Sequence, residues 1–498
     1  MRIFHFSDTH VGSREHFNED ALLRIFEEIN TGDYDLVIHT GDITEGGQRK
    51  DYERAEKIFE GLEKPVIILP GNHDTRSGGL HLFEEYIGPS NDVREIGDAV
   101  VIYVNSSIAD SNAGRVGRVK YNLIRDALNE YSDKPIKIIG VHHHILPIPM
   151  SGRERNTLSN AGDLLDLITR ADVDMVLSGH RHYPNVYHIE GTMVINAGTA
   201  SSRKTRYGDV NSYNIIEIGG ETKRVETHRP DRSTVTREFP AREKRIYSDF
   251  GERVFRAVHV SNTFISNTRA FLTQHLSNAL NTIRSLEPDL MVHCGGVVQE
   301  GIQQDYDLAL RYLEDCDFPI IYTPAGRDIN YLGYHLFNTY FGLQDQKYAT
   351  DEMLFQGISS AQYDSTIGIV GETDRGELVG KMNAAPQKFK ALFLHHNIIP
   401  IPHSREKGLL EDAGDFLREV LDAEIDLVLT GTSSHPYAAK VDNTVIVNAN
   451  SLSSIYQRSL FGNSFNLIDI YEGVIAVFEV NSLWGKRRLL GLYERNHQ

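Results

Sequence analysis

The stretch LVIHTGDITEG, residues 36–46, decides the fold of the N-terminal half of the chain. Its apolar, β-branched start is typical of a buried strand, and the GD pair follows where that strand ends. Apolar runs also precede SDTH (residues 7–10), GNHD (71–74), His142 and GHRH (179–182). Side chains just past strand ends lie on loops at one edge of a sheet, where a rigid scaffold brings distant residues together. This order predicts an α/β fold with one polar edge.

The five polar patches contain the side chains that a pair of metal ions requires. Asp and His bind Mn, Fe and Zn, and a neutral Asn carbonyl adds a donor without adding charge. Phosphoester hydrolysis at a two-metal centre needs such mixed ligands around two cations about 3.5–4 Å apart. One patch alone is weak evidence, because GD or HxH occurs in many proteins. Five patches in this order, each after a strand, are specific.

At these residues the chain resembles the calcineurin-like metallophosphoesterases. The spacing, GDIT (residues 41–44) and HHHILPIP (142–149) are most similar to the class III cyclic nucleotide phosphodiesterases. The resemblance spans roughly residues 1–240. It implies a four-layer α-β-β-α sandwich, in which two mixed sheets pack face to face with helices outside. It also implies two divalent or mixed-valence metal ions, with Mn or Fe favoured and Zn as an alternative.

The resemblance assigns two sets of metal ligands that share one carboxylate. The sets are Asp8, His10, Asp42 and His182 for one ion, and Asp42, Asn72, His142 and His180 for the other. Asp42 would therefore bridge the two ions. A hydroxide that bridges the metals is the expected nucleophile on phosphorus, because bound metal lowers the pKa of water.

Three residues of GNHD form the predicted catalytic group. Asn72 is expected to neutralise charge on the phosphate as well as to bind metal. His73 cannot readily share the direction of Asn72 along an extended turn, so it is predicted to face the substrate as leaving-group acid or phosphate contact. Asp74 is predicted to orient the ring of His73. The alternative for His73 is an ordinary packed or solvent-facing loop histidine.

Two further histidines follow a predicted ligand directly. His143 and His144 either support the metal site or fill space. Pro147 and Pro149 predict a stiff extended segment that leaves the site and lines a pocket wall. Neither histidine is assigned a role.

The chain also repeats itself. LMVHCGGVVQEG, from residue 290, echoes the GD segment, and HHNIIPIP, from residue 395, echoes HHHILPIP. Asn262 lies 254 positions after Asp8, and Gly296 lies 254 positions after Asp42. A nearly constant offset indicates a duplication.

The second copy lacks most of the predicted ligands. The replacements are Asn262 for Asp8, Phe264 for His10, Gly296 for Asp42, Gly326 for Asn72, Arg327 for His73 and GTSS for GHRH. His395, the counterpart of His142, is kept, but one imidazole cannot hold two metal ions. The second copy is therefore predicted to be metal-free and inactive. His143 has a counterpart in His396, which favours a folding role for it.

The strand pattern restarts at VFRAVHVSNT, residues 254–263, after a polar, Arg-rich stretch. The predicted domains are residues 1–248, the active one, and 249–498, the degenerate one, each long enough for a core. Between the strands, helices are predicted at Glu19–Ile29, Tyr52–Leu62, Asn122–Tyr131 and Asp163–Arg170.

Composition narrows the partners and the compartment. A net charge of −18 disfavours a long nucleic-acid duplex as ligand. No apolar run approaches the roughly 18 residues of a membrane span, and MRIFHFSDTH opens directly into a strand without a signal peptide. Two cysteines, Cys294 and Cys316, fit a reducing compartment. The cytoplasm is therefore the expected location.

Three functions follow from these observations. The first is metal-dependent hydrolysis of a phosphodiester, with a cyclic or other small nucleotide as the expected substrate. The second is a nuclease on single-stranded or short nucleic acid that would bind through the basic loops Ser151–Arg155 and Ser201–Arg206. The third is a sensor or scaffold in which the second domain binds a protein partner or a second copy. Phosphomonoester hydrolysis also stays open.

Overall fold

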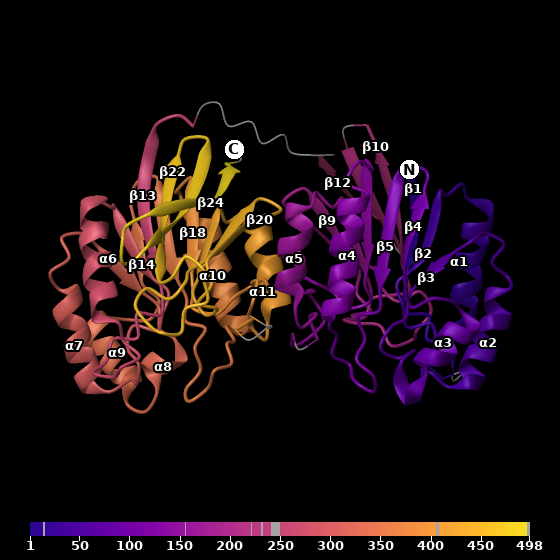
Figure 1. Cartoon of the computed structure of the whole chain (residues 1–498), viewed down its shortest axis with the longest axis horizontal. Helices are drawn as coiled ribbons and strands as arrows, with labels where there is room; N and C mark the ends of the chain where they lie inside the picture. The colour runs from indigo at the N-terminus through magenta and orange to yellow at the C-terminus, as the bar shows by residue number, and fades with distance from the viewer. Residues whose placement is uncertain are drawn as a thin grey trace. The chain divides into compact units, whose positions relative to one another are not determined.

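The structure, a computed structural model, describes residues 1–12, 15–154, 156–220, 222–230, 233–240, 250–404 and 408–495. The chain divides into two compact units, Met1–Lys244 (unit 1) and Arg245–Gln498 (unit 2). Unit 1 runs from indigo to magenta in Figure 1, and unit 2 continues to yellow. The domain boundary predicted at residues 248 and 249 lies outside the described residues.

The first sheet of unit 1 has the strand order β12-β11-β10-β1-β2-β3. Its strands are β1 (Arg2–Phe6), β2 (Leu36–His39), β3 (Ile67–Ile68), β10 (Tyr213–Gly219), β11 (Thr222–His228) and β12 (Val235–Pro240). β1, β2 and β3 run parallel, so their carboxyl ends share one edge. Asp8, Asp42 and Asn72 follow these three ends.

The other strands of unit 1 are ordered β8-β9-β7-β6-β5-β4. They are β4 (Asn91–Ile96), β5 (Ala99–Val104), β6 (Ile136–Gly140), β7 (Met175–Ser178), β8 (Asn185–Ile189) and β9 (Thr192–Asn196). β5, β6, β7 and β9 are parallel. His142 follows the end of β6, and GHRH follows the end of β7.

The two sheets of unit 1 pack face to face. One buried cluster contains Ile3 and Ile38 from the first sheet together with Ile138, Leu177 and Ile195 from the second. The helices are α1 (Glu19–Thr31), α2 (Arg49–Phe59), α3 (Leu80–Tyr86), α4 (Arg118–Glu130) and α5 (Ala161–Arg170). Figure 1 shows the strands between α1 on one side and α4 and α5 on the other. The predicted four-layer α/β sandwich is confirmed in unit 1.

The helix ends show the limits of sequence pattern. α2 begins at Arg49, three residues before the predicted start, because its first turn is polar and carries no apolar period. α4 begins at Arg118, four residues before the predicted start, because the Val119 of its first turn is exposed and takes no part in the buried face. The short helix α3 was not predicted. It has two fully packed residues, Leu82 and Phe83, which is too few to mark a helical period.

Unit 2 has the same arrangement of strands. Its orders are β15-β14-β13-β22-β23-β24 and β16-β17-β18-β19-β21-β20. The first sheet comprises β13 (Arg253–Val260), β14 (Leu290–His293), β15 (Ile320–Tyr322), β22 (Ser464–Tyr471), β23 (Val474–Asn481) and β24 (Arg487–Glu494). The second comprises β16 (Lys347–Ala349), β17 (Met353–Gly357), β18 (Phe389–Phe393), β19 (Leu427–Thr430), β20 (Tyr437–Val441) and β21 (Thr444–Asn448).

The helices of unit 2 follow the order of those in unit 1. They are α6 (Thr273–Ser285), α7 (Gln303–Leu313), α8 (Gly326–Ile329), α9 (Gly333–Phe341), α10 (Glu372–Ala384) and α11 (Ala413–Asp422). None of the described helices of the chain combines the length and apolar character needed to cross a membrane. A cytoplasmic location stays a prediction.

Matching hydrogen bonds hold the sheet-edge loops in the two units. The hydroxyl of Tyr52, on α2, donates to the carbonyl of Asp74 at 2.7 Å. The hydroxyl of Tyr306, on α7, donates to the carbonyl of Asp328 at 2.6 Å. Both tyrosines are fully buried, so each bond ties a helix to the loop that follows the third strand of its sheet.

Replacing either tyrosine with Phe should destabilise its unit by about 1–3 kcal/mol, because the carbonyl loses a buried donor. Urea unfolding of Tyr52→Phe and Tyr306→Phe, with the unfolding of each unit followed separately, measures the loss of stability. The exposed Tyr331→Phe is the control and should change stability by less than about 0.5 kcal/mol. Equal stability of all three variants would contradict the assignment.

Candidate metal centre

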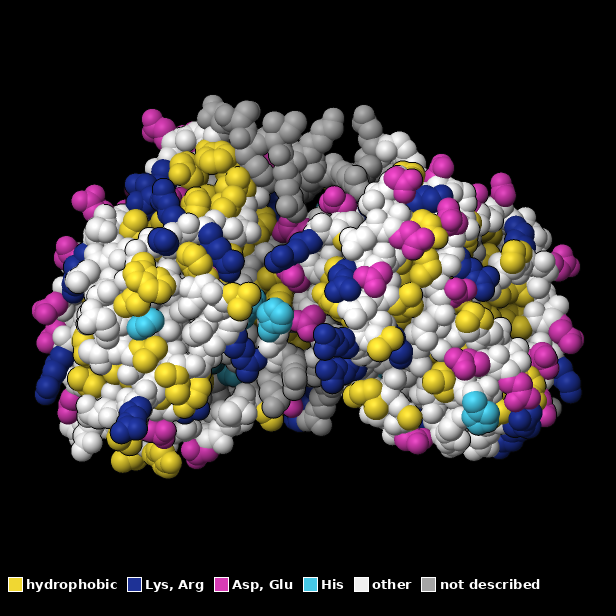
Figure 2. Space-filling view, viewed as in Figure 1, with side chains coloured by type: hydrophobic (Ala, Val, Ile, Leu, Met, Phe, Trp, Pro, Cys, Tyr) yellow, Lys and Arg dark blue, Asp and Glu magenta, His cyan; other side chains and the backbone are white. Residues whose placement is uncertain are grey.

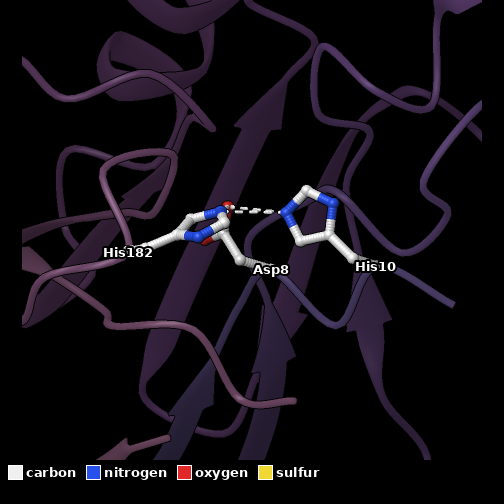
Figure 3. Close-up of side chains that lie close together, drawn as sticks. All are labelled: Asp8, His10 and His182. Atoms are coloured by element: carbon white, nitrogen blue, oxygen red, sulfur yellow. Dashed lines mark hydrogen bonds and ion pairs between the residues drawn. The ribbon is translucent and has the colours of Figure 1, made fainter. Parts of the chain in front are cut away.

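The first predicted ligand set meets at the carboxyl edge of unit 1. The ring nitrogen Nε2 of His182 lies 3.2 Å from Oδ1 of Asp8, and Nε2 of His10 lies 3.7 Å from the same oxygen. The two Nε2 atoms are 2.9 Å apart. Figure 3 shows the three side chains directed toward one another. Such convergence of two imidazoles and a carboxylate is the geometry of a metal site.

The second set meets around Asn72. Its Oδ1 lies 3.1 Å from Nε2 of His142 and 2.9 Å from Nδ1 of His180. Nε2 of His142 is also 3.3 Å from Oδ2 of Asp42. Asp42, His142 and His180 can each offer an atom to one ion. This set joins loops of both sheets.

Asp42 lies between the two sets. Its Oδ2 is 3.7 Å from Nε2 of His10, in addition to its contact with His142. Its Oδ1 accepts a hydrogen bond from the backbone of His73 at 2.8 Å. The carboxylate therefore faces both ligand groups, as a bridging ligand must.

Hydrogen bonds on the far side of two rings fix which nitrogen faces inward. Nδ1 of His142 bonds to the carbonyl of Thr40 at 2.8 Å, and Nδ1 of His182 bonds to the carbonyl of Lys204 at 2.6 Å. A ring that donates from Nδ1 presents an unprotonated Nε2 to a metal. The mixed nitrogen and oxygen donors thus fit two Mn, Fe or Zn ions, and the chain does not choose among them.

Most of the predicted ligands adopt a backbone conformation that non-glycine residues avoid. Positive φ angles occur at Asp8 (56°), His10 (50°), Asp42 (58°), His180 (75°) and His182 (55°). Each such residue costs on the order of 1–3 kcal/mol and persists only when its surroundings hold it. Such strain is typical of functional sites. Only glycine fits at position 179, because a Cβ added to Gly179 would lie 2.5 Å from a carboxylate oxygen of Asp8.

Burial and charge act against each other in this cluster. Burial would raise the pKa of Asp8, but His182 and His10 beside it lower that pKa well below its usual range. Burial would lower the pKa of His10, but hydrogen bonds and charges from Asp8, Glu45 and Asp42 raise it to about 10. The pKa of His142 is raised to about 9, against burial, by Asp42 above all. Without metal, the rings of His10 and His142 are therefore positively charged at pH 7.

His73 lies beside the ligands but is more accessible than they are. Its Nδ1 is 2.7 Å from the carbonyl of Glu45 and 2.9 Å from Nη1 of Arg76. Its ring meets that of His10 edge to face, with centroids 4.5 Å apart. Burial lowers the pKa of His73 to about 4, so the ring is neutral at pH 7.

The predicted role of Asp74 is wrong. Its carboxylate accepts hydrogen bonds from the backbone N–H groups of Ile43, Thr44 and Gly71, whereas the His73 ring bonds to Glu45. Asp328 makes the matching bonds to backbone groups in unit 2. A role present in both units is structural: Asp74 holds two sheet-edge loops together.

Sequence analysis missed Glu45, three residues after Asp42. Its Oε2 is 3.0 Å from Nδ1 of His10, and its Oε1 accepts from Nζ of Lys204 at 2.8 Å. The repeat contained a signal for it, because unit 2 has Gln299 at the position of Glu45 and Phe264 at that of His10. Unit 2 therefore lacks both the carboxylate of Glu45 and the histidine that it contacts, His10.

The two unassigned histidines have different surroundings. Nδ1 of His143 bonds to the hydroxyl of Ser106 at 2.8 Å, and His396 bonds to Ser360 in the same way in unit 2. His143 is therefore structural. His144 instead pairs with the buried carboxylate of Glu154 at 2.9 Å, and unit 2 has Asn397 at its position.

Unit 2 has no room for the missing ligands. A Cβ added to Gly296, the counterpart of Asp42, would lie 2.9 Å from the ring of Phe264. A Cβ at Gly326, the counterpart of Asn72, would lie 2.4 Å from the carbonyl of Ser365. The three ligand clusters found among the described residues all lie in unit 1.

Comparison with known proteins agrees with the site. Residues 1–184 match the family model of the calcineurin-like phosphoesterases. A glycerophosphodiester phosphodiesterase, GpdQ, of Enterobacter lignolyticus is 26% identical over 207 residues, which cover 36% of this chain and 71% of that protein. The 3',5'-cyclic adenosine monophosphate phosphodiesterase CpdA of Escherichia coli K12 is 24% identical over 195 residues, covering 36% of this chain and 70% of that protein.

Among solved structures, that of a dimetal phosphatase from Danio rerio is similar to this chain. The match covers 48% of this chain and 99% of that chain, with 8% identity and a TM-score of 0.41.

Metal binding should release protons, because ions must displace those on His10 and His142. The apparent affinity for Mn²⁺ should therefore rise between about pH 6 and pH 9. Calorimetric titration of the metal-free protein in buffers of different ionisation enthalpy measures the proton release. Binding heats that do not depend on the buffer would contradict these protonation states.

Proposed function

We propose that unit 1, whose residues 1–184 match the family model of the calcineurin-like phosphoesterases, uses two metal ions to hydrolyse a small phosphodiester. A cyclic or other small nucleotide is the first candidate substrate, and a glycerophosphodiester is the second. One of the relatives is named as a glycerophosphodiester phosphodiesterase and another as a cyclic nucleotide phosphodiesterase, and each match covers 36% of this chain. The observation that carries the proposal is the pair of ligand sets that share Asp42.

Bound metal ions would supply a hydroxide nucleophile at neutral pH and offset charge on the phosphoryl oxygens. The chain's part is to hold the donors. The Asp42 carboxylate separates the imidazoles of the first set from those of the second. The amide oxygen of Asn72 faces His142 and His180, while its Nδ2 lies 3.3 Å from Oδ1 of Asn112. This contact fixes the amide's orientation.

His73 is proposed to contact the substrate through Nε2. Its two neighbours at Nδ1 require opposite tautomers: the Glu45 carbonyl needs a proton on Nδ1, whereas the Arg76 guanidinium needs an unprotonated Nδ1. With Arg76 as donor, the proton sits on Nε2. A neutral His73 then keeps a donor for the phosphate or the leaving oxygen. Arg76 thus supports the proposed role of His73 as a phosphate contact, whereas action as a leaving-group acid needs the imidazolium, which burial disfavours by lowering the pKa of His73 to about 4.

The charges near the site favour a small substrate over nucleic acid. Lys204, in one of the two basic loops, is paired with Glu45 at 2.8 Å. Arg153, Arg203 and Arg206 of these loops are exposed, and Arg155 lies outside the described residues. These few cations could contact a short strand, but the net charge of −18 disfavours a longer nucleic acid. The nuclease remains the alternative proposal.

Unit 2 is proposed to be a duplicated copy that holds no metal. Its turns repeat the positive φ angles of unit 1 at Asn262 (52°), Phe264 (47°) and Ser434 (41°). A bulky aromatic residue rarely adopts this conformation. Unit 2 has Phe264 where unit 1 has His10, and Arg327 where unit 1 has His73. The guanidinium of Arg327 lies 5.4 Å from the centre of the Phe264 ring.

Partner binding through unit 2 is a second candidate function. Tyr331 and Leu332 are exposed where unit 1 has Ser77 and Gly78, and Tyr456 is exposed where unit 1 has Lys204. Figure 2 shows hydrophobic side chains along the lower edge of the left-hand part, near α8. Since unit 1 folds with small or polar residues at these positions, folding does not explain the apolar ones. Contact with a protein partner or a second copy would explain them.

Asp42→Ala should lose most bound metal and lower hydrolysis of bis-p-nitrophenyl phosphate by at least about a thousandfold, because both ligand sets lose a carboxylate. Metal analysis and turnover with added Mn²⁺ measure the two effects. The wild type should prefer this diester to p-nitrophenyl phosphate. Full activity of Asp42→Ala, or of demetallated protein, would refute the proposal, and retained metal would show that the other unit 1 ligands hold an ion without Asp42.

His73→Ala should keep the metal ions but lose about 10²–10⁴-fold in kcat on diesters with poor leaving groups. The loss should be smaller on bis-p-nitrophenyl phosphate, whose leaving group needs little protonation. Arg327→Ala, at the matching position of unit 2, is the control and should retain wild-type kcat. Equal losses for both substrates would leave His73 as a phosphate contact only.

A further inference from the structure

Arg181 stands between two ligand histidines in GHRH and is itself buried. Its Nη2 donates to the carbonyl of Ser151 at 2.6 Å and to that of Arg153 at 3.3 Å. It also lies 2.8 Å from the hydroxyl of Ser151. The guanidinium therefore ties the turn after β7 to the loop at Ser151 and Arg153. A buried cation is costly unless hydrogen bonds and negative charge compensate it, as these carbonyls and the nearby Glu154 do.

The turn that Arg181 ties down is strained on both sides of it. His180 and His182 have φ angles of 75° and 55°. The backbone N–H of His180 points at the carboxylate of Asp8, at 3.0 Å from Oδ2. With its backbone in this position, His180 presents Nδ1 to Asn72. A strained residue keeps such a conformation only when neighbouring contacts hold it.

Unit 2 shows what the turn does without the arginine. Ser433 takes the place of Arg181, and Thr432, the counterpart of His180, is not among the residues with positive φ. The N–H of Thr432 donates to the carbonyl of His395 at 2.9 Å instead of facing the side chain of Asn262. The turn has relaxed at one residue, the one that would carry the ligand. Ser434, the counterpart of His182, keeps a positive φ.

The same loop contains a second buried charge. The carboxylate of Glu154 accepts from the backbone N–H of Thr157 at 3.1 Å and pairs with His144 at 2.9 Å. The His144 ring lies parallel to that of His180, 17° apart in plane, with centroids 5.9 Å apart. In unit 2, Asn397 replaces His144 and donates a hydrogen bond from its amide to Ser433. In unit 2 a neutral pair thus takes the places of His144 and Arg181.

We propose that Arg181 is a positioning residue: it anchors the turn to Ser151 and Arg153 and so holds His180 in the left-handed conformation in which its Nδ1 faces Asn72 and would serve as a ligand of the second ion. His144 and Glu154 support the same ring from the loop side. The inference rests on the proposed two-metal function. It concerns a residue that lies behind the ligands and contributes no ligand atom.

Arg181→Ser, which introduces the residue of unit 2, should weaken binding of one of two Mn²⁺ ions by about 10–100-fold, as loss of a contact behind a metal ligand typically does. Calorimetric titration with Mn²⁺ and the exchange-coupled EPR signal of a Mn²⁺ pair are the readouts. Arg181→Lys, which keeps a cation with hydrogen-bond donors, should regain part of the affinity. Catalysis should follow the occupancy of the second site, with kcat restored at high Mn²⁺.

A matched control separates this effect from simple loss of stability. Arg375 is also buried, and it binds Asp412 at 2.6 Å and Glu419 at 3.0 Å in unit 2. Arg375→Ser should lower stability without changing Mn²⁺ affinity. If Arg181→Ser does not fold, the triple variant His144→Asn, Glu154→Gln, Arg181→Ser, which also removes the buried carboxylate paired with His144, introduces the neutral pair of unit 2 and tests the same point.

The outcomes distinguish this inference from the proposed function. If the wild type binds no pair of ions, the proposed function fails. If the wild type binds two ions and Arg181→Ser binds both with unchanged affinity, the positioning role of Arg181 is overturned. Equal weakening of both ions, or the same weakening in Arg375→Ser, would also overturn it.

Discussion

Two buried carboxylates at one sheet edge constrain the rest of this structure. Asp8 and Asp42 are almost inaccessible to water, and a buried negative charge is tolerated only beside positive charge or hydrogen-bond donors. The chain provides the partners from the other sheet, through His142 and the GHRH turn. Protons on His10 and His142 offset the carboxylates without metal, and metal ions can take their place. Compensation of these two buried charges thus requires side chains from both sheets at one site.

The comparison of the two units separates the scaffold from its chemistry. In unit 1 the backbone of Asp8 bonds to the carbonyl of Gly41, and in unit 2 that of Asn262 bonds to Gly295 in the same way. Asp74 and Asp328 hold their loops identically. These bonds impose the left-handed turns whether or not ligands are present. Glu45, His144 and Arg181 differ between the units together with the ligands, which marks them as part of the chemistry.

Much of the fold was predictable because the strands are continuous apolar runs that end in polar motifs. The ligand residues were predictable for the same reason: Asp8, Asp42 and His142 each follow a strand end, and parallel strands place such ends together. Helix starts such as that of α2 were displaced, since a polar first turn has no apolar period. Asp74 was misassigned because sequence adjacency to His73 says nothing about which backbone groups its carboxylate meets.

By itself the sequence determined where the strands lie along the chain, which residues are candidate ligands and which of them the second copy lacks. Each of these depends on local pattern or on residue type. Tertiary structure alone decided that Phe264 fills the space beside Gly296, that Glu45 contacts His10, and that Arg181 reaches the loop at Ser151. These contacts join segments far apart in sequence or depend on the volume between them. Their formation depends on how the loops pack, which no single segment encodes.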